Sequence, residues 1–342
     1  ARSETTIAMI QPDVPALVLA PMEGVTDAPM RAVQGLTGAF TYAVTEFLRV
    51  TQTALPRGVV LRHVPELRNG CRTRTGLPVQ VQLLGGDAGL VGESAAVAVE
   101  LGATAIDLNF GCPAPTVNRH DGGATLLKYP HRIREIVAAV RAAVPREVPV
   151  SAKMRLGWDR LDPIFENAEM AAQGGASWIT IHGRTRTAGY APPIFWAPIG
   201  KVRERLGIPV VANGDIWTIA DFRRCREETG CVHYMLGRSA LANPHLPRQA
   251  AAELGLAPRE PECEFDAPID WPAQLQRLVA WSEEFPDCRP GRVLARLKQW
   301  LSMAAKFGAF TRFDAVKRAE SLDELFAGLD ERAAVGCLST SG

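Results

Sequence analysis

The stretch PVSAKMRLGWDRLDPIFENAEMAAQGGASWITIHGR, residues 149–184, holds two strand-like runs with a helical pattern between them. Both runs, 149–156 and 178–184, are largely apolar without strict alternation, which is typical of strands that are buried on both faces. The pattern at 165–174 predicts a helix that ends at Gly174, because glycine commonly follows the last helical turn. The stretch therefore predicts one strand–helix–strand unit.

The same pattern continues on either side of this stretch. Six more runs are predicted as strands: LVLAP (17–21), TYAVTEF (41–47), PVQVQLL (78–84), AIDLNFG (105–111), PVVANG (209–214) and VHYMLGR (232–238). Helical patterns separate several of them, at 88–101, 132–144, 198–206 and 219–229. Eight strands that alternate with helices predict a TIM (β/α)8 barrel. The rival architecture, a doubly wound open sheet, is disfavoured because no G-x-G-x-x-G fingerprint follows the first strand.

A small all-α helical domain is predicted after the barrel. Residues 255–270 are rich in proline and acidic residues and predict a linker. Beyond them the sequence turns helical at 271–285, at 290–307 and in a region from 314 to 329. We therefore predict a catalytic barrel over 1–254 and a helical domain over 255–342.

Composition places the chain among ordinary globular proteins. Of its 342 residues, 47% are hydrophobic and 22% are charged, and the formal net charge is +1. No run approaches the roughly 20 apolar residues of a membrane span, and Gln11, Pro12 and Asp13 interrupt the N-terminal segment in a way that does not fit a signal peptide. The seven cysteines form neither a C-x-x-C nor a zinc-like cluster with histidine. We expect a cytoplasmic monomer without a metal site or membrane contact.

Polar side chains close most of the predicted strands. They are Glu46, Gln82, Asn109, Lys153, Arg155, His182, Arg184, Asn213, Asp215 and Arg238. In a (β/α)8 barrel the carboxyl ends of all strands meet at one face, where active sites are built. A single polar strand end can have a purely structural role. Because seven of the eight predicted strands end in polar residues, we predict a functional face.

The ends of the seventh and eighth strands fit a phosphate site. They read Asn213-Gly214-Asp215 and Gly237-Arg238, and the loops after these two strands are the usual phosphate position of a TIM barrel. Glycine lets backbone N–H groups approach the phosphate, and an arginine can pair with it through two hydrogen bonds. The alternative is two ordinary tight turns.

Lys153 and His182 are candidates for contacting a bound ligand. Lys153 lies in an otherwise apolar strand, and a buried lysine needs a charged or polar partner. Beside a flavin it would stabilise the negative charge of the reduced ring. A Schiff-base lysine and a plain ion pair are the alternatives. His182 would hydrogen-bond the ring system, unless it is a core histidine with protein partners only.

Cys112 begins the loop after the fourth predicted strand, on the functional face. The following Pro113 fixes the direction of the chain, and thiols in such positions are often chemically active. A buried, inert cysteine remains the alternative interpretation of this position.

Residues 289–318 carry eight basic residues against one acid, Asp314. Arg292 and Arg296 are one helical turn apart and therefore share a face. A clustered basic face suits the phosphate backbone of a nucleic acid, and a solvated helix face is the alternative.

Several of these motifs together resemble the tRNA-dihydrouridine synthase family. They are LAPMEGVTD (19–27), TEFLRV (45–50), VQLLG (81–85), DLNFGCP (107–113), SAKMRLGWD (151–159), HGRTR (182–186) and ANGDIW (212–217). The match runs roughly from Leu17 to Lys317, and the order of N-x-G-C-P, K-x-R, H-G-R-T and N-G-[DE] is specific.

The resemblance implies FMN in the barrel mouth, reduced by NADPH. The residues expected at the flavin are Pro21, Met22 and Glu23 along its edge, Gln82, Lys153 and His182 at the ring, and Asn213, Gly214, Asp215, Gly237 and Arg238 at ribityl and phosphate. The flavin would pass hydride to C6 of a uracil in tRNA. Cys112 would give the proton to C5, a role that needs a neutral thiol, and Asn109 would orient the base.

Four stretches resemble the bacterial C-type subgroup, which acts at position 16 of tRNA. They are TEFLRV (45–50), GRTRTAGY (183–190), NGDIW (213–217) and RLKQWLS (296–302). The residues expected to contact tRNA are Arg49, Asn109, Tyr190, Arg296, Lys298 and Lys317 by resemblance, together with Arg292 of the basic face.

Two other functions compete with this one. An FMN barrel that acts on free pyrimidines, similar to dihydroorotate or dihydropyrimidine dehydrogenases, gives no reason for the basic C-terminal helices. A non-catalytic RNA-binding barrel gives no reason for Cys112, Lys153 and His182 to share one face.

Overall fold

The computed structural model describes residues 9–118, 121–257, 267–285, 288–308 and 310–330. The chain forms two compact units. The first contains residues 1–237 and 247–259, and the second contains 238–246 and 260–342. No described helix is long and apolar enough to cross a membrane.

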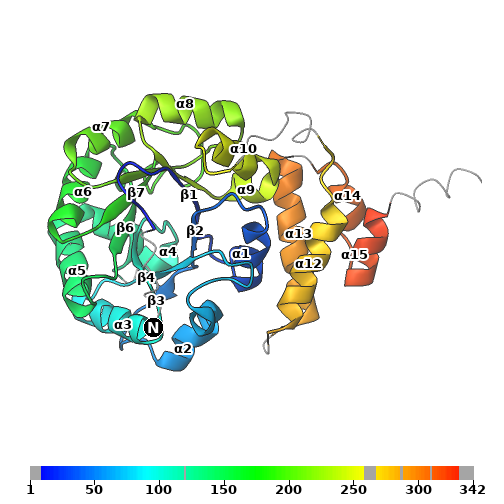
Figure 1. The fold of residues 1–342 in the computed structure, drawn as a ribbon, viewed down its shortest axis with the longest axis horizontal. Helices are drawn as coiled ribbons and strands as arrows, with labels where there is room; N and C mark the ends of the chain where they lie inside the picture. Colours follow the sequence, from blue (N-terminus) through cyan, green and yellow to red (C-terminus); the bar gives the residue numbers. More distant parts are fainter. Residues whose placement is uncertain (1–8, 119–120, 258–266, 286–287, 309, 331–342) are drawn as a thin grey trace, which may run out of the picture. The chain divides into compact units, whose positions relative to one another are not determined.

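The first unit is a closed parallel barrel, which confirms the predicted (β/α)8 fold (Figure 1). Its eight strands are β1 (Ala16–Leu19), β2 (Tyr42–Val44), β4 (Val79–Leu84), β5 (Ile106–Phe110), β6 (Val150–Arg155), β7 (Trp178–His182), β8 (Val210–Asn213) and β9 (His233–Leu236). They pair in the order β2-β1-β9-β8-β7-β6-β5-β4, and a β2–β4 pairing closes the barrel. The strand residues are almost entirely buried, as apolar runs without alternation require.

The second predicted strand is shorter than expected, because 41–47 does not continue as one strand. It ends at Val44, and the two-residue strand β3 (Leu48–Arg49) then pairs with β4. Side chains contribute to the hydrogen bonding in the gap: the Thr45 hydroxyl accepts from the Gln82 N–H at 2.9 Å, and Glu46 accepts from the Val25 N–H at 3.1 Å. Glu46 thereby joins the loop after β2 to the loop after β1.

Helices surround the barrel (Figure 1). The five predicted ones are α3 (Ala88–Glu100), α5 (Pro130–Ala143), α6 (Pro163–Gln173), α7 (Ala197–Arg205) and α8 (Ile219–Thr229). Helix α8 shows why the pattern was readable: Thr218 and Asp221 form a capping box at its start, and Gly230 ends it with a φ of 58°.

The remaining elements of the first unit and of its connections were not predicted. They are α1 (Ala28–Gly35), α2 (Arg57–His63), η1 (Pro65–Asn69), α4 (Pro115–Asn118), η2 (Gly123–Lys128) and α10 (His245–Glu253).

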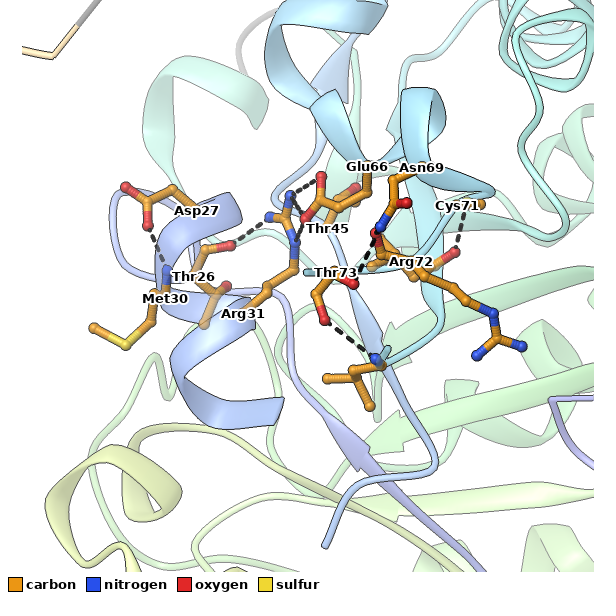
Figure 2. A network of polar contacts seen from close by, with 12 residues as sticks. Thr26, Asp27, Met30, Arg31, Thr45, Glu66, Asn69, Cys71, Arg72 and Thr73 are labelled. Carbon is orange, nitrogen blue, oxygen red and sulfur yellow. Dashed lines mark hydrogen bonds and ion pairs between the residues drawn. The ribbon is translucent and has the colours of Figure 1, made fainter. Parts of the chain in front are cut away.

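A buried ion pair fixes the loop that follows β1 (Figure 2). The guanidinium of Arg31 in α1 donates to both carboxylate oxygens of Glu66 in η1, at 2.8 and 2.9 Å, and to the carbonyl of Thr26 at 2.6 Å. The Thr26 hydroxyl accepts from the Met22 N–H at 2.8 Å. A bidentate pair with a third hydrogen bond satisfies charges that would be costly to bury alone, so residues 20–27 have a defined path.

The second unit is all helical, with α9 (Arg238–Ala242), α12 (Trp271–Glu283), α13 (Pro290–Phe307), α14 (Phe313–Val316) and α15 (Leu322–Leu329). Its core is aromatic: the Trp271 ring lies 5.9 Å from Trp300 and 5.6 Å from Phe310. Helix α9 belongs to this unit because the Trp300 indole N–H donates to the Leu241 carbonyl at 2.8 Å. The predicted helical region 314–329 is two helices, since Ser321 caps a new one.

Candidate functional site

The polar strand ends occupy neighbouring positions at the carboxyl end of the barrel, as predicted. Asn109 on β5 lies beside Lys153 on β6, and His182 on β7 lies between Arg155 and Asn213 in the strand pairing. Gln82 on β4 is fully buried next to these strands. The parallel register therefore gathers five strands' polar residues at one end of the barrel.

Cys112 is held by the side chain of Asn109. The Asn109 Oδ1 accepts the N–H groups of Gly111 at 3.0 Å and of Cys112 at 2.9 Å. The Cys112 thiol is half-buried, and this burial raises its pKa above the ordinary value, an effect that Glu23 reinforces and that Lys153 opposes. The thiol therefore keeps its proton at neutral pH.

Arg155 connects the loop of Cys112 to the loop after β7, a role that the sequence did not predict. Its Nε donates to the Gly111 carbonyl at 2.9 Å, and its Nη1 donates to the carbonyls of Thr185 at 2.9 Å and Gly189 at 2.8 Å. The guanidinium carbon lies 5.3 Å from the ring centroid of Tyr190, which is 57% exposed. The predicted tRNA contact Tyr190 is therefore presented to solvent beside the loop of the cysteine.

Lys153 makes no hydrogen bond or ion pair with any residue that the structure describes. Burial, reinforced by Arg155, lowers its pKa to about 8, and Asp107 opposes the shift. A pKa of about 8 leaves the ammonium charged at neutral pH. A half-buried cation that makes no hydrogen bond to the described residues fits a ligand that supplies an acceptor or negative charge, such as a flavin ring. The negative charge of Asp107 acts on Lys153, but the two form no close ion pair.

The Asn213-Gly214-Asp215 turn can only be built with glycine at its centre. Gly214 has a φ of +115°, and a Cβ there would lie 2.7 Å from the Ile194 Cδ1 and 3.3 Å from the His182 Nε2. The Trp196 indole N–H holds the Gly214 carbonyl at 2.9 Å, and the Asp215 carboxylate pairs with the buried Arg184. Backbone groups rather than the Asp215 carboxylate are therefore what this turn offers to a phosphate.

The loop after β1 lies beside the end of β9. A Cβ on Gly237 would be 3.4 Å from the Met22 Sδ, so Pro21, Met22 and Glu23 are brought next to the predicted phosphate loop. Burial raises the pKa of Glu23, and a nearby positive charge on His63 lowers it. Arg49 donates to the Thr116 carbonyl at 3.2 Å, which places this predicted tRNA contact against the segment after Cys112.

In the second unit, the predicted basic residues lie mostly on one helix. Helix α13 buries Val293, Leu297 and Trp300, whereas Arg292 is exposed and Arg296 and Lys298 are half-buried. Lys317 forms an ion pair with Asp314, so its charge is partly compensated. The guanidinium carbon of Arg238 lies 5.8 Å from the Phe307 ring centroid.

The sequence predicted no specific role for three charged residues of the site. They are Asp107, Arg155 and Arg184, of which the two arginines were expected only as polar strand ends. Asp107 is 1% exposed and Arg184 is fully buried. The signal available for Asp107 was a charged side chain inside an apolar strand, which is the same signal that pointed to Lys153. Among the residues that the structure describes, no group of three or more His, Cys, Asp or Glu side chains could hold a metal ion.

A family model described as "Dihydrouridine synthase (Dus)" matches residues 18–321. The chain belongs to the dihydrouridine synthase family. Among its relatives in that family, the tRNA-dihydrouridine(16) synthase of Aquipseudomonas alcaligenes is 44% identical over 318 residues, covering 91% of this chain and 98% of the relative. The enzymes of the same name from Pseudomonas syringae pv. tomato and Neisseria meningitidis serogroup A are each 42% identical over 314 residues, 90% of this chain and 96% and 92% of theirs.

Solved structures share the fold of this dihydrouridine synthase. Histamine dehydrogenase from Rhizobium sp. 4-9 superposes with a TM-score of 0.55 at 13% identity, over 78% of this chain and 48% of its own. A 2-naphthoyl-CoA reductase in complex with 2-naphthoyl-CoA gives a TM-score of 0.53 at 10% identity, over 70% of this chain and 50% of its own. At such identities the likeness concerns the barrel alone.

The raised pKa of Cys112 has a measurable consequence for this dihydrouridine synthase. Iodoacetamide reacts with the thiolate, so the alkylation rate of Cys112 is expected to rise through a midpoint above the ordinary thiol value of 9.0. Mass spectrometry of the Cys112 peptide after timed labelling at a series of pH values measures it, with the same peptide from urea-unfolded protein as the control. A midpoint below that of the unfolded protein would contradict the burial argument.

Proposed function

We propose that this chain is an FMN-dependent tRNA-dihydrouridine synthase that reduces uridine 16, with NADPH as the reductant and Cys112 as the general acid. The observation that carries the proposal is the placement of two groups at the barrel mouth. Cys112 is a thiol that keeps its proton at neutral pH, and the neighbouring strand end carries Lys153, a cation that makes no hydrogen bond or close ion pair with the described residues.

The residues fit FMN by their chemistry. Lys153 would lie at the ring with Gln82 and His182, and the turn at Gly214 with Gly237 and Arg238 would take the phosphate. Pro21, Met22 and Glu23 would pass along the ring edge, and Asn213 and Asp215 would hold the ribityl chain. Bound FMN, reduced by NADPH, supplies a hydride for C6 of the uracil.

The protein's own part in the reaction is to place the base and to deliver a proton. Cys112 donates its thiol proton to C5 of the uracil, which completes the addition of one hydride and one proton across the C5–C6 bond. Reprotonation of the thiolate from solvent restores the acid. Lys153 remains a fixed positive charge near the site of reaction, where it favours charge that develops in the transition state.

The proposed substrate is folded tRNA rather than a free pyrimidine. A base reaches the barrel mouth only when it is flipped out of the tRNA, and the exposed Tyr190 is a surface on which it can stack. Arg49, Asn109 and Tyr190 on the barrel, and Arg292, Arg296, Lys298 and Lys317 on the helical unit, are the proposed tRNA contacts. Position 16 is proposed from the relatives of 42–44% identity that carry this number in their names.

A single reaction tests the proposal. The purified protein is expected to show flavin absorbance and, with NADPH and unmodified tRNA, to convert uridine 16 and not uridine 20. Mass spectrometry of nuclease fragments locates the product, and NADH in place of NADPH measures the reductant preference. Modification at 20 alone would contradict the proposed target. A protein that reduces free uracil but not tRNA, or that binds tRNA without flavin or turnover, would support the competing functions.

A further inference from the structure

A chain of hydrogen bonds leads from the barrel interior to the backbone of Cys112. It begins at Asp107 on β5, whose Oδ2 accepts from the Gln82 Nε2 at 2.7 Å. The Gln82 Oε1 accepts from the Asn109 Nδ2 at 2.8 Å, and the Asn109 Oδ1 accepts the N–H groups of Gly111 and Cys112. Asp107 and Gln82 are 1% and 0% exposed, so water does not compete for these bonds.

The two ends of this chain allow only one orientation of the two carboxamides between them. An ionised carboxylate only accepts hydrogen bonds, and backbone N–H groups only donate them. Gln82 must therefore turn its amino group toward Asp107 and its oxygen toward Asn109. Asn109 must in turn present its oxygen to Gly111 and Cys112, which is the arrangement observed.

Donors face both carboxylate oxygens of Asp107, which suits a group that accepts hydrogen bonds. The Ser151 hydroxyl donates to the Asp107 Oδ1 at 2.5 Å, and it is aimed there because its own oxygen accepts from the Gln80 Nε2 at 2.9 Å. Burial raises the pKa of Asp107, while Ser151, Gln82 and the positive charge of Lys153 each lower it.

We infer that Asp107 is a positioning residue, which fixes the orientation of the Gln82 and Asn109 carboxamides and through them the place of Cys112. Asn109 has both acceptor positions of its oxygen filled by Gly111 and Cys112, so it offers a ligand only its second Nδ2 hydrogen. Resting on the proposed function, this makes Asn109 a donor to a carbonyl oxygen of the base and leaves it unable to accept from an amino group, such as the one that cytosine has where uracil has a second carbonyl.

The isosteric change Asp107→Asn tests the inference, because it puts an N–H group where the chain needs an acceptor. If that group faces Gln82, both carboxamides must turn over and Asn109 loses its bonds to Gly111 and Cys112. If it faces Ser151, that hydroxyl must accept from residue 107 as well as from Gln80, and its own O–H loses the acceptor that Asp107 provides. We expect iodoacetamide to alkylate Cys112 about tenfold faster than in wild type, since two hydrogen bonds of the loop weaken. Turnover on saturating tRNA is expected to fall about 100-fold.

A second substitution is expected to restore the orientation. In Asp107→Asn/Gln82→Glu the carboxylate, which only accepts, lies at residue 82 instead of residue 107. Asn109 therefore again donates to residue 82, and its oxygen again accepts from the N–H of Cys112. Alkylation at wild-type rate in this double variant is the expected result. Turnover is not compared there, because Gln82 is also a proposed flavin contact. Ser151→Ala is the matched control: it removes one hydrogen bond from Asp107 but leaves the orientation unchanged.

Three outcomes would overturn the inference: wild-type alkylation of Cys112 in Asp107→Asn, failure of the double variant to restore it, or an equal effect of Ser151→Ala. If Asp107→Asn does not fold, the double variant is the test, since it is expected to fold with wild-type alkylation. The labelling needs neither tRNA nor flavin, so it is independent of the proposed function, which fails on its own if wild type forms no dihydrouridine.

Discussion

Cys112→Ala is expected to lower the rate of dihydrouridine formation about 100- to 10,000-fold, which is the usual cost of losing a general acid. Flavin absorbance is expected to remain, because the proposed FMN contacts come from other strands and the Cys112 backbone is held by Asn109, not by its own side chain. Single-turnover formation of dihydrouridine from pre-reduced enzyme and unmodified tRNA measures the chemical step. Flavin reduction by NADPH in the absence of tRNA is expected to be unchanged.

Cys288→Ala is the control for this experiment. Cys288 is half-buried like Cys112, but it lies in the helical unit and is not among the proposed site residues. It controls for the loss of a partly exposed thiol. Turnover of Cys112→Ala within a few-fold of wild type would remove the thiol from the mechanism, and loss of flavin with the substitution would show that the loop has a binding role instead.

The double charge reversal Arg292→Glu/Arg296→Glu is expected to weaken tRNA binding about 100-fold at moderate salt. Each lost charged contact is worth about 1.5 kcal/mol, and about 1.4 kcal/mol is a factor of ten. Each lost phosphate contact also releases one counterion fewer, so the slope of log K against log salt is expected to become shallower by about 2. Filter binding or anisotropy with labelled tRNA over a salt series measures both quantities.

Lys201→Glu/Arg205→Glu provides a matched control. These two residues are exposed and, like Arg292 and Arg296, one turn apart, but they lie on α7 of the barrel, outside the predicted basic face. The same change in net charge there is expected to alter the salt slope much less. If both pairs behave alike, tRNA responds to overall charge and α13 has no special part in binding. Flavin reduction by NADPH is expected to be unaffected in both variants.

Local sequence pattern was sufficient for most of the fold. The eight barrel strands and five surrounding helices follow from apolar runs, periodicity and helix ends such as the Thr218 capping box, all of which act within a few residues. The break after Val44 was not predictable in this way. There the Thr45 hydroxyl and the Glu46 carboxylate bond to residues 37 and 21 positions away, and a contact of that range leaves no local trace.

The same distinction applies to the site. Parallel register brings Asn109, Lys153 and His182 together whenever the barrel is recognised, so their neighbourhood could be predicted. The direction in which Asn109 points could not, because it depends on Gln82 and Asp107 across the β4–β5 pair. The bridge from Arg155 to Gly111, Thr185 and Gly189 has the same character, since it joins two loops, after β5 and after β7, that are separate in sequence.

The grouping of α9 with the C-terminal helices bears on how members of this family can be recombined. The chain enters the helical unit at 238, leaves it at 247 and returns at 260, so no single cut separates the two units. Ser239 to Ala242 are buried, and the Leu241 carbonyl depends on the indole of Trp300. If only the segment after residue 260 were taken from a relative, the relative's counterpart of Trp300 would pack against the original α9. Exchange of the whole helical unit between relatives therefore calls for two coordinated insertions, one of which begins directly after Gly237.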